Sequence, residues 1–156
     1  MNQHAIKLRI ATHADIDTLV DFNAAMALET EAKQLDRDVL RAGVAGVLDQ
    51  PRRGFYLLAE VTENIAGGLL VTYEWSDWRC GDWWWIQSVF VRPEFRRHGV
   101  FRALHAEVEQ RARAADAVGI RLYVEWENQR AQQTYEVLGM QREHYHMYAQ
   151  AFRNIL

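Results

Sequence analysis

The sequence predicts a mixed α/β domain, and three observations lead to this prediction. Stretches that alternate apolar and polar residues are interspersed with stretches whose apolar residues recur every three or four positions, in the order β-α-α-β-β-β-α-β-α-β. The length of 156 residues is that of one domain. Apolar residues make up 49% of the chain and charged residues 25%, a mixture that can bury a core and excludes a largely disordered protein. We therefore expect one domain over residues 1–156.

The N-terminal third predicts one strand followed by two helices. Apolar and polar residues alternate over 6–10, which favours a strand. Thr12 is a suitable cap for a helix over 16–27, where apolar side chains recur at helical spacing. A second helix is predicted over 36–48, because its apolar residues form one stripe. Pro51 then ends the helical pattern.

The middle of the chain predicts three consecutive strands. Residues 55–61 and 65–75 read as a hairpin whose tight turn lies at Glu63 and Asn64. Residues 83–91 are rich in aromatic and β-branched side chains, which favours a further strand. Three strands in a row exclude a regular doubly wound fold, in which strands and helices alternate.

The C-terminal part predicts two helices and two strands. A helix over 99–117 carries apolar residues on one face, and a strand follows over 120–126. A short helix over 128–138 ends at Gly139. Residues 141–152 alternate well enough for a last strand, and we expect that this strand pairs either within the chain or across a homodimer.

Charge and cysteine content exclude several classes of function. The net charge of −3 gives no overall positive field to hold a polyanion, so no nucleic-acid partner is expected. Cys80 is the only cysteine, which excludes an internal disulfide and a multi-thiolate site, and no metal is expected. No stretch approaches the roughly 18 apolar residues of a membrane span, and no membrane partner is expected. Residues 1–14 lack the features of a signal peptide, which predicts a cytoplasmic protein.

Five of the six tryptophans lie between Trp75 and Trp85. Such a cluster is typical of core or interface packing. The wall of a ligand pocket is the alternative interpretation. The sequence leaves both open.

A strand, an arginine-rich loop, a glycine and a helix follow one another over residues 89–102. A loop entering a helix presents unpaired backbone N–H groups and the positive end of the helix dipole, and Gly99 lets an anion approach the backbone. Further donors around this point come from four side chains, Arg96, Arg97, His98 and Arg102. The pattern favours a phosphate site, with a solvated arginine run beside an ordinary helix start as the alternative.

Two segments resemble motifs of the GNAT superfamily of N-acetyltransferases. The first is similar to its acetyl-CoA signature, Gln/Arg-x-x-Gly-x-Gly/Ala, in which Arg96 and Gly99 occupy the first and fourth positions. Phe101 departs from the signature, because its sixth position is normally glycine or alanine. The second segment resembles the family's later pattern of strand, asparagine, alanine, tyrosine and a helix-ending Leu-Gly-Phe/Met, carried here by 122–128, Ala131, Tyr135, Leu138, Gly139 and Met140.

The resemblance implies a fold and a cofactor. The GNAT fold has a twisted, mostly antiparallel mixed sheet flanked by helices, and acetyl-CoA enters a splayed parallel pair, here 83–91 and 120–126. The strand backbone is expected to pair with the pantetheine arm, and the amides of the loop are expected to hold the pyrophosphate. The cofactor-binding residues implied are Val89, Phe90, Val91, Arg96, Arg97, His98, Gly99, Val100, Phe101, Arg102 and Asn128.

Acetyl transfer to an amine needs an acid for the departing thiolate and a route for the amine proton. Tyr135 matches the family's acid position, seven residues after Asn128. Some relatives place a glutamate five residues before that asparagine, a position that Tyr123 occupies here. Glu125, two residues further on, shares the strand face of Tyr123 by alternation and is therefore the first candidate for the base. Glu74 is the second candidate, while many relatives use a chain of waters instead.

The acceptor is expected to be a small or medium-sized primary amine that attacks acetyl-CoA directly in a ternary complex. Carboxylates beside aromatic residues suit a cationic amine, and the candidates are Glu29, Glu31, Glu74 and Asp77. A protein or peptide N-terminus is one alternative acceptor. A non-catalytic domain that binds acyl-CoA as a sensor is another alternative, favoured by Phe101 and by the absence of a glutamate at Tyr123.

Overall fold

The computed structural model describes residues 5–153 of the chain, which divides into two compact units, 1–122 and 123–156. The first unit holds most of the secondary structure, and each predicted helix and strand forms there, although the strand predicted over 120–126 ends at Arg121. Its strands are β1 (Ile6–Ile10), β2 (Gly54–Val61), β3 (Asn64–Ser76), β4 (Gly81–Val91) and β5 (Gly119–Arg121). Its helices are α1 (Ile16–Glu31), α2 (Arg37–Leu48) and α3 (Val100–Ala114), with 3-10 turns at His13–Asp15, Pro51–Arg53 and Pro93–Phe95.

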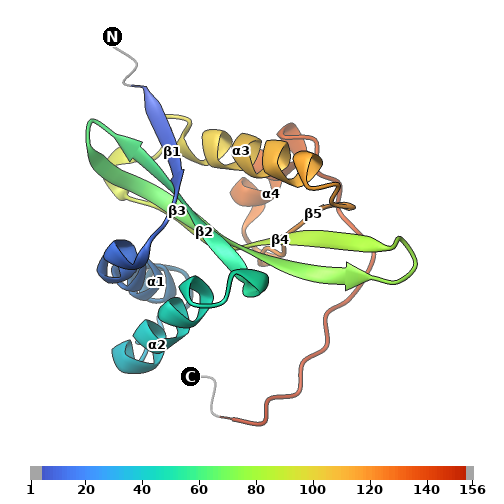
Figure 1. Ribbon diagram of the computed structural model, residues 1–156, viewed down its shortest axis with the longest axis horizontal. Helices are drawn as coiled ribbons and strands as arrows, with labels where there is room; N and C mark the ends of the chain where they lie inside the picture. Colours follow the sequence, from blue (N-terminus) through green and yellow to red (C-terminus); the bar gives the residue numbers. More distant parts are fainter. Residues whose placement is uncertain (1–4, 154–156) are drawn as a thin grey trace. The chain divides into compact units, whose positions relative to one another are not determined.

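The five strands form one sheet in the order β1-β2-β3-β4-β5. The pairs β1·β2, β2·β3 and β3·β4 are antiparallel, whereas β4 and β5 run parallel. Helices α1 and α2 cover one face of the sheet and α3 covers the other (Figure 1). The predicted mixed, mostly antiparallel sheet flanked by helices is confirmed.

The core lies on both faces of the sheet because neighbouring residues of the central strands point in opposite directions. Leu57 and Leu69 pack toward α3, where they meet Leu104. Leu58 and Leu70 pack toward α1 and α2, in a second apolar cluster. Burial on both faces explains why β2 and β3 read as nearly continuous apolar runs.

The turn between β2 and β3 lies one residue earlier than predicted. Val61 pairs with Asn64, so Thr62 and Glu63 are the two turn residues. Both have positive φ angles, 49° and 64°, as hairpin turns that match the strand twist require. Asparagine and glycine are the residues that usually occupy turn positions with positive φ. For this reason the sequence pattern favoured a turn that included Asn64.

A charged network fastens β1 to β2 and to the start of α1. The Arg9 guanidinium donates two hydrogen bonds of 2.8 Å to Asp15 and a third to Glu60. The backbone N–H of Thr12 also donates to Asp15, at 2.8 Å. Asp15 is only 6% exposed, and the bonds from Arg9 hold the pKa of its carboxyl below the usual range. The buried charge is therefore paired, as the cost of burying it requires.

His105 is buried on α3 and is 5% exposed. Within residues 5–153, its Nε2 atom has no hydrogen-bond partner. Burial lowers the pKa of this imidazole below its ordinary value of 6.5, while the nearby charge of Glu109 acts in the opposite direction. The unfolded chain therefore binds the proton more readily than the folded chain.

Acidification from pH 7.5 to 5.5 is expected to destabilise the protein in part through His105. The contribution is fully present above about pH 6.5 and is lost as the pH falls toward the lower folded pKa. Thermal unfolding followed by circular dichroism is expected to give a smaller fall in Tm for His105→Leu than for the wild type. His98→Leu is the control, because His98 is exposed. Equal falls in Tm for the wild type and His105→Leu would contradict this role.

The second unit contains α4 (Gln129–Val137), close to the helix predicted over 128–138. The two strands predicted in the C-terminal part, over 120–126 and 141–152, differ from the structure. The predicted strand over 120–126 ends at Arg121, where the pairing with β4 stops. The predicted strand over 141–152 is not formed, and its side chains are exposed, with Tyr148 at 94%. A strand needs a paired neighbour, and among the described residues none pairs with 141–152. The homodimer stays a prediction.

Within residues 5–153, no helix combines the length and the apolar composition needed to cross a bilayer.

Candidate functional site

A bulge interrupts β4 near its C-terminal end. Gly68 pairs with Phe90 and Leu70 pairs with Gln87, so β4 supplies one residue more than β3 between these pairs. Ser88 lies in the bulge and has a φ of 50°, in the left-handed region. Bulges of this kind re-aim the backbone and are common beside active sites.

The edge of β4 beyond the bulge is open in the first unit. β5 pairs only with 83–85, so within residues 5–122 the segment 86–91 forms a ladder with β3 alone. The two parallel strands thus share only three residue pairs. An unpaired strand edge offers backbone N–H and C=O groups to an extended ligand.

Arg96 opens the arginine turn, defined here as residues 96–99. Its Nε donates to the carbonyl of Val91 at 2.8 Å. Its two terminal nitrogens donate to the Glu29 carboxylate on α1 at 2.7 and 2.8 Å. These bonds hold the pKa of Glu29 below its usual range. Arg96 therefore ties α1 to the end of β4, and all three of its nitrogens are engaged.

The rest of the arginine turn and the start of α3 present free donors. Arg97 and Gly99 have positive φ angles of 65° and 80°. The first helical amides have no acceptor within a helix. In the described part of the chain, the following backbone N–H groups donate no hydrogen bond: Arg97, His98, Gly99, Val100 and Arg102. The side chains of Arg97, His98 and Arg102 are exposed, and a Cβ added at Gly99 would meet no atom within 4 Å. The turn is suited to an anion.

Phe101 lies just inside α3, and its ring is half-buried. The ring centroid lies 6.2 Å from that of His105, one helical turn further along. The bulky side chain at the sixth signature position is thus directed along the helix.

The predicted catalytic residues lie in the second unit, around α4. Asn128 caps this helix, its Oδ1 accepting a bond of 3.1 Å from the Ala131 N–H. Tyr135 is half-buried, and burial raises the pKa of its phenol. Glu125 is exposed and does not belong to a strand. Alternation along a strand, on which its placement beside Tyr123 was based, does not apply because β5 ends at Arg121.

The four acceptor candidates come from two places and are each engaged with a neighbour. On α1, Glu29 binds Arg96, and Glu31 lies 3.1 Å from the Lys33 ammonium. On the β3–β4 hairpin, Glu74 accepts from Arg121 at 2.9 Å and from the Trp85 indole at 3.2 Å. Asp77 accepts from the Trp78 N–H at 2.9 Å. Among the described residues, no hydrogen bond or ion pair joins the α1 pair to the hairpin pair.

A comparison with known families identifies the family to which the chain belongs. The family model described as "Acetyltransferase (GNAT) family" matches residues 17–140, which is most of the chain. The chain belongs to the GNAT acetyltransferase family. It is therefore an acetyltransferase, and members of this family use acetyl-CoA.

Solved structures support membership of the GNAT family. The chain is 43% identical to a possible acetyltransferase from Clostridium difficile 630, with a TM-score of 0.89, over 96% of this chain and 99% of that one. A predicted acetyltransferase with acetyl-CoA from Clostridium acetobutylicum is 15% identical, with a TM-score of 0.77, over 94% of this chain and 96% of that one. This second likeness shows the fold alone. The comparison with curated proteins gave no match.

Two features of the candidate site had no recognisable signal in the sequence. The bulge depends on the left-handed conformation of Ser88. A serine within a segment of high β-propensity does not indicate such a conformation. The ion pair between Arg96 and Glu29 joins residues 67 positions apart, so local patterns could not reveal it. The sequence did indicate the glycine at the start of α3 and the cap at Asn128.

Proposed function

We propose that the protein transfers an acetyl group from acetyl-CoA to the primary amine of a small or medium-sized acceptor by direct attack in a ternary complex. The observation that carries this proposal is the set of backbone N–H groups of 97–100 and Arg102 that donate no hydrogen bond among the described residues, next to the open edge of β4. Phosphate binds readily to such a helix start. Guanidinium groups that engage no described residue, those of Arg97 and Arg102, add two positive charges at the same place.

The residues present fit the proposed donor. The amides of 97–102 and the side chains of Arg97, His98 and Arg102 bind the diphosphate, and the backbone of 89–91 pairs with the pantetheine arm. Acetyl-CoA supplies the acetyl group as a thioester. A backbone N–H of 89–91 polarises the thioester carbonyl, because within residues 5–122 the edge of β4 that faces away from β3 is unpaired there and the bulge at Ser88 re-aims the backbone. Arg96 acts through position, since its nitrogens already bind Val91 and Glu29.

Tyr135 is proposed as the general acid and Asn128 as a second cofactor contact. The raised pKa of the Tyr135 phenol keeps it protonated at neutral pH, as a group that donates a proton to a thiolate must be. Glu125 is the first candidate to take the amine proton, and its exposure leaves it open to solvent. Glu74 is less suited, because both of its oxygens accept hydrogen bonds. A chain of waters is the alternative route.

The test is an acceptor screen with the purified full chain. Acetyl-CoA is mixed with small primary amines and with short peptides, and release of the CoA thiol and formation of acetylated product are followed together. We expect turnover with small amines, above a reaction that lacks amine. Turnover of peptides alone would replace the small-amine acceptor with a protein N-terminus. Binding of acetyl-CoA without any turnover would favour the sensor.

A further inference from the structure

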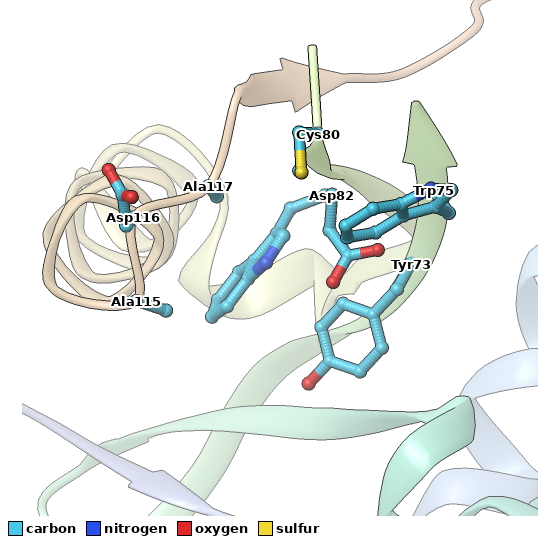
Figure 2. A pocket seen from close by; sticks show the side chains of 9 residues that line it. Tyr73, Trp75, Cys80, Asp82, Ala115, Asp116 and Ala117 are labelled. Atoms are coloured by element: carbon cyan, nitrogen blue, oxygen red, sulfur yellow. The ribbon is translucent and has the colours of Figure 1, made fainter. Parts of the chain in front are cut away.

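A pocket lies between the end of the β3–β4 hairpin and the segment that follows α3. Its volume is about 350 Å³, which is within the range of small-ligand sites. Strand residues Tyr73, Trp75, Asp82 and Trp84 line one side, and Asp116 lines the other. Figure 2 shows the Trp75 ring beside the Asp82 carboxylate, with the Tyr73 ring nearby and Asp116 across the opening. The pocket adjoins the C-terminal end of α3, whereas the arginine turn leads into its N-terminal end.

Sheet register places the four strand residues on one face. Tyr73 pairs with Trp84, and Trp75 pairs with Asp82, so each pair projects to the same side of the hairpin. The rings of Tyr73 and Trp84 meet edge to face, with centroids 5.4 Å apart. Trp84 is 8% exposed and Trp75 is 62% exposed. The pocket thus has a buried aromatic floor and an accessible aromatic rim.

The charge in this pocket is entirely negative. Asp82 and Asp116 line it, and neither carboxylate forms an ion pair or a hydrogen bond with a described residue. No arginine, lysine or histidine is among its lining residues. Burial, with a smaller contribution from the Asp82 charge, raises the pKa of the Tyr73 phenol. The phenol therefore stays neutral and adds no second anion beside Asp82.

The opposite face of the same hairpin also combines an aromatic ring with a carboxylate, and there an arginine of the chain supplies the positive charge. The Arg121 guanidinium lies 3.9 Å from the Trp83 ring centroid and donates to Glu74. Arg79 lies over the same ring at 5.6 Å. On that face, the guanidinium group contacts the aromatic ring and forms an ion pair with the carboxylate, so both groups have a cationic partner within the chain. On the pocket face, the rings of Trp75 and Trp84 and the Asp82 carboxylate have no such cation among the lining residues.

We propose that this pocket binds a small organic cation, an alkylammonium whose charge lies against the aromatic rim and faces Asp82. Aromatic faces and a carboxylate are the groups that recognise such cations. The site is separate from the arginine turn, because the 15 residues of α3 span about 22 Å between them. The proposal does not depend on acetyl transfer.

Choline and its neutral isostere 3,3-dimethyl-1-butanol test the charge requirement with the full chain. The two molecules have nearly the same shape, so isothermal titration of both isolates the contribution of the charge. We expect saturable binding of choline and at least tenfold weaker binding of the alcohol. Equal affinities, or no saturable binding of choline, would overturn the proposal without any variant.

Substitution then locates the site. Asp82→Asn removes the charge at nearly constant shape and is expected to weaken choline binding at least fivefold, whereas Asp38→Asn, on the exposed side of α2, leaves it unchanged. Affinity for acetyl-CoA is expected to be equal in the wild type and in Asp82→Asn, so failure of this site is distinguishable from failure of the proposed donor site. Unchanged choline binding in Asp82→Asn would place the cation elsewhere and overturn the assignment.

Cys80 provides an independent measurement on the unmodified chain. It lines the pocket, is exposed, and is the only cysteine. Choline is expected to slow its alkylation by a maleimide, and the neutral alcohol at the same concentration is expected to have little effect. Alkylation that is indifferent to choline would contradict binding in this pocket.

Discussion

Replacement of Gly99 by valine is expected to weaken acetyl-CoA binding about 30-fold or more. Gly99 has a φ of 80°, and a β-branched residue in the left-handed region costs about 2 kcal/mol, which corresponds to about 30-fold in Kd if the turn relaxes in the free protein. A Cβ added there would meet no described atom within 4 Å, so it projects into the open space where the diphosphate is proposed to bind. Titration of the variant with acetyl-CoA measures the effect.

Gly139→Val is the matched control for this prediction. Gly139 also has a positive φ, 92°, and a Cβ there also meets nothing within 4 Å. The two variants therefore share the backbone strain, and only Gly99→Val is expected to lose acetyl-CoA affinity beyond what its stability loss explains. An affinity for Gly99→Val equal to that of Gly139→Val would remove the arginine turn from the donor site.

Tyr135→Phe is expected to lower turnover at least tenfold while the affinity for acetyl-CoA stays near that of the wild type. A positioned general acid contributes about 10²–10⁴-fold, and solvent can supply part of what the phenol no longer gives. Phenylalanine keeps the ring and removes only the hydroxyl, so the packing of the half-buried side chain changes little. Steady-state rates with the best amine from the acceptor screen, together with acetyl-CoA titration, separate the two effects.

Tyr148→Phe serves as its control, because Tyr148 is almost fully exposed and has no proposed role. Turnover by Tyr135→Phe at the wild-type rate would exclude the phenol as the acid. A parallel loss of acetyl-CoA affinity would instead indicate that Tyr135 positions the donor.

Periodicity predicted most of the elements of the first unit because their spacing reflects burial against a neighbour. The stripe over 36–48 became α2, and the alternating stretch over 6–10 became β1. The same reasoning failed for residues 141–152, where alternation is present but no described strand pairs with it. Side-chain patterning indicates which face can be buried, and only a partner strand supplies the hydrogen bonds that make a strand.

In the candidate site too, the features with a local sequence signature were predicted, whereas contacts between residues distant in sequence were not. The glycine at position 99 and the basic side chains beside it were evident, because a helix start with these residues has a local signature. The engagement of Glu29 and Glu74 was not evident, since their partners Arg96 and Arg121 are distant in sequence. These ion pairs reduce the free negative charge expected for the acceptor, whereas Asp82, which had no predicted role, keeps its charge uncompensated.

The bridge from Arg96 to Glu29 has a thermodynamic consequence. The bridge joins the first residue of the arginine turn, where acetyl-CoA is proposed to bind, to α1, which carries two candidate residues for the acceptor site. If binding of one substrate shifts this bridge, the affinity for the other substrate changes as well. Linkage makes such an effect reciprocal: acetyl-CoA and the amine change each other's dissociation constants by the same factor. The side chains of Arg96 and Glu29 are both partly exposed to solvent, which keeps that factor small. The order in which the two substrates bind is then set by their rates of binding rather than by this linkage.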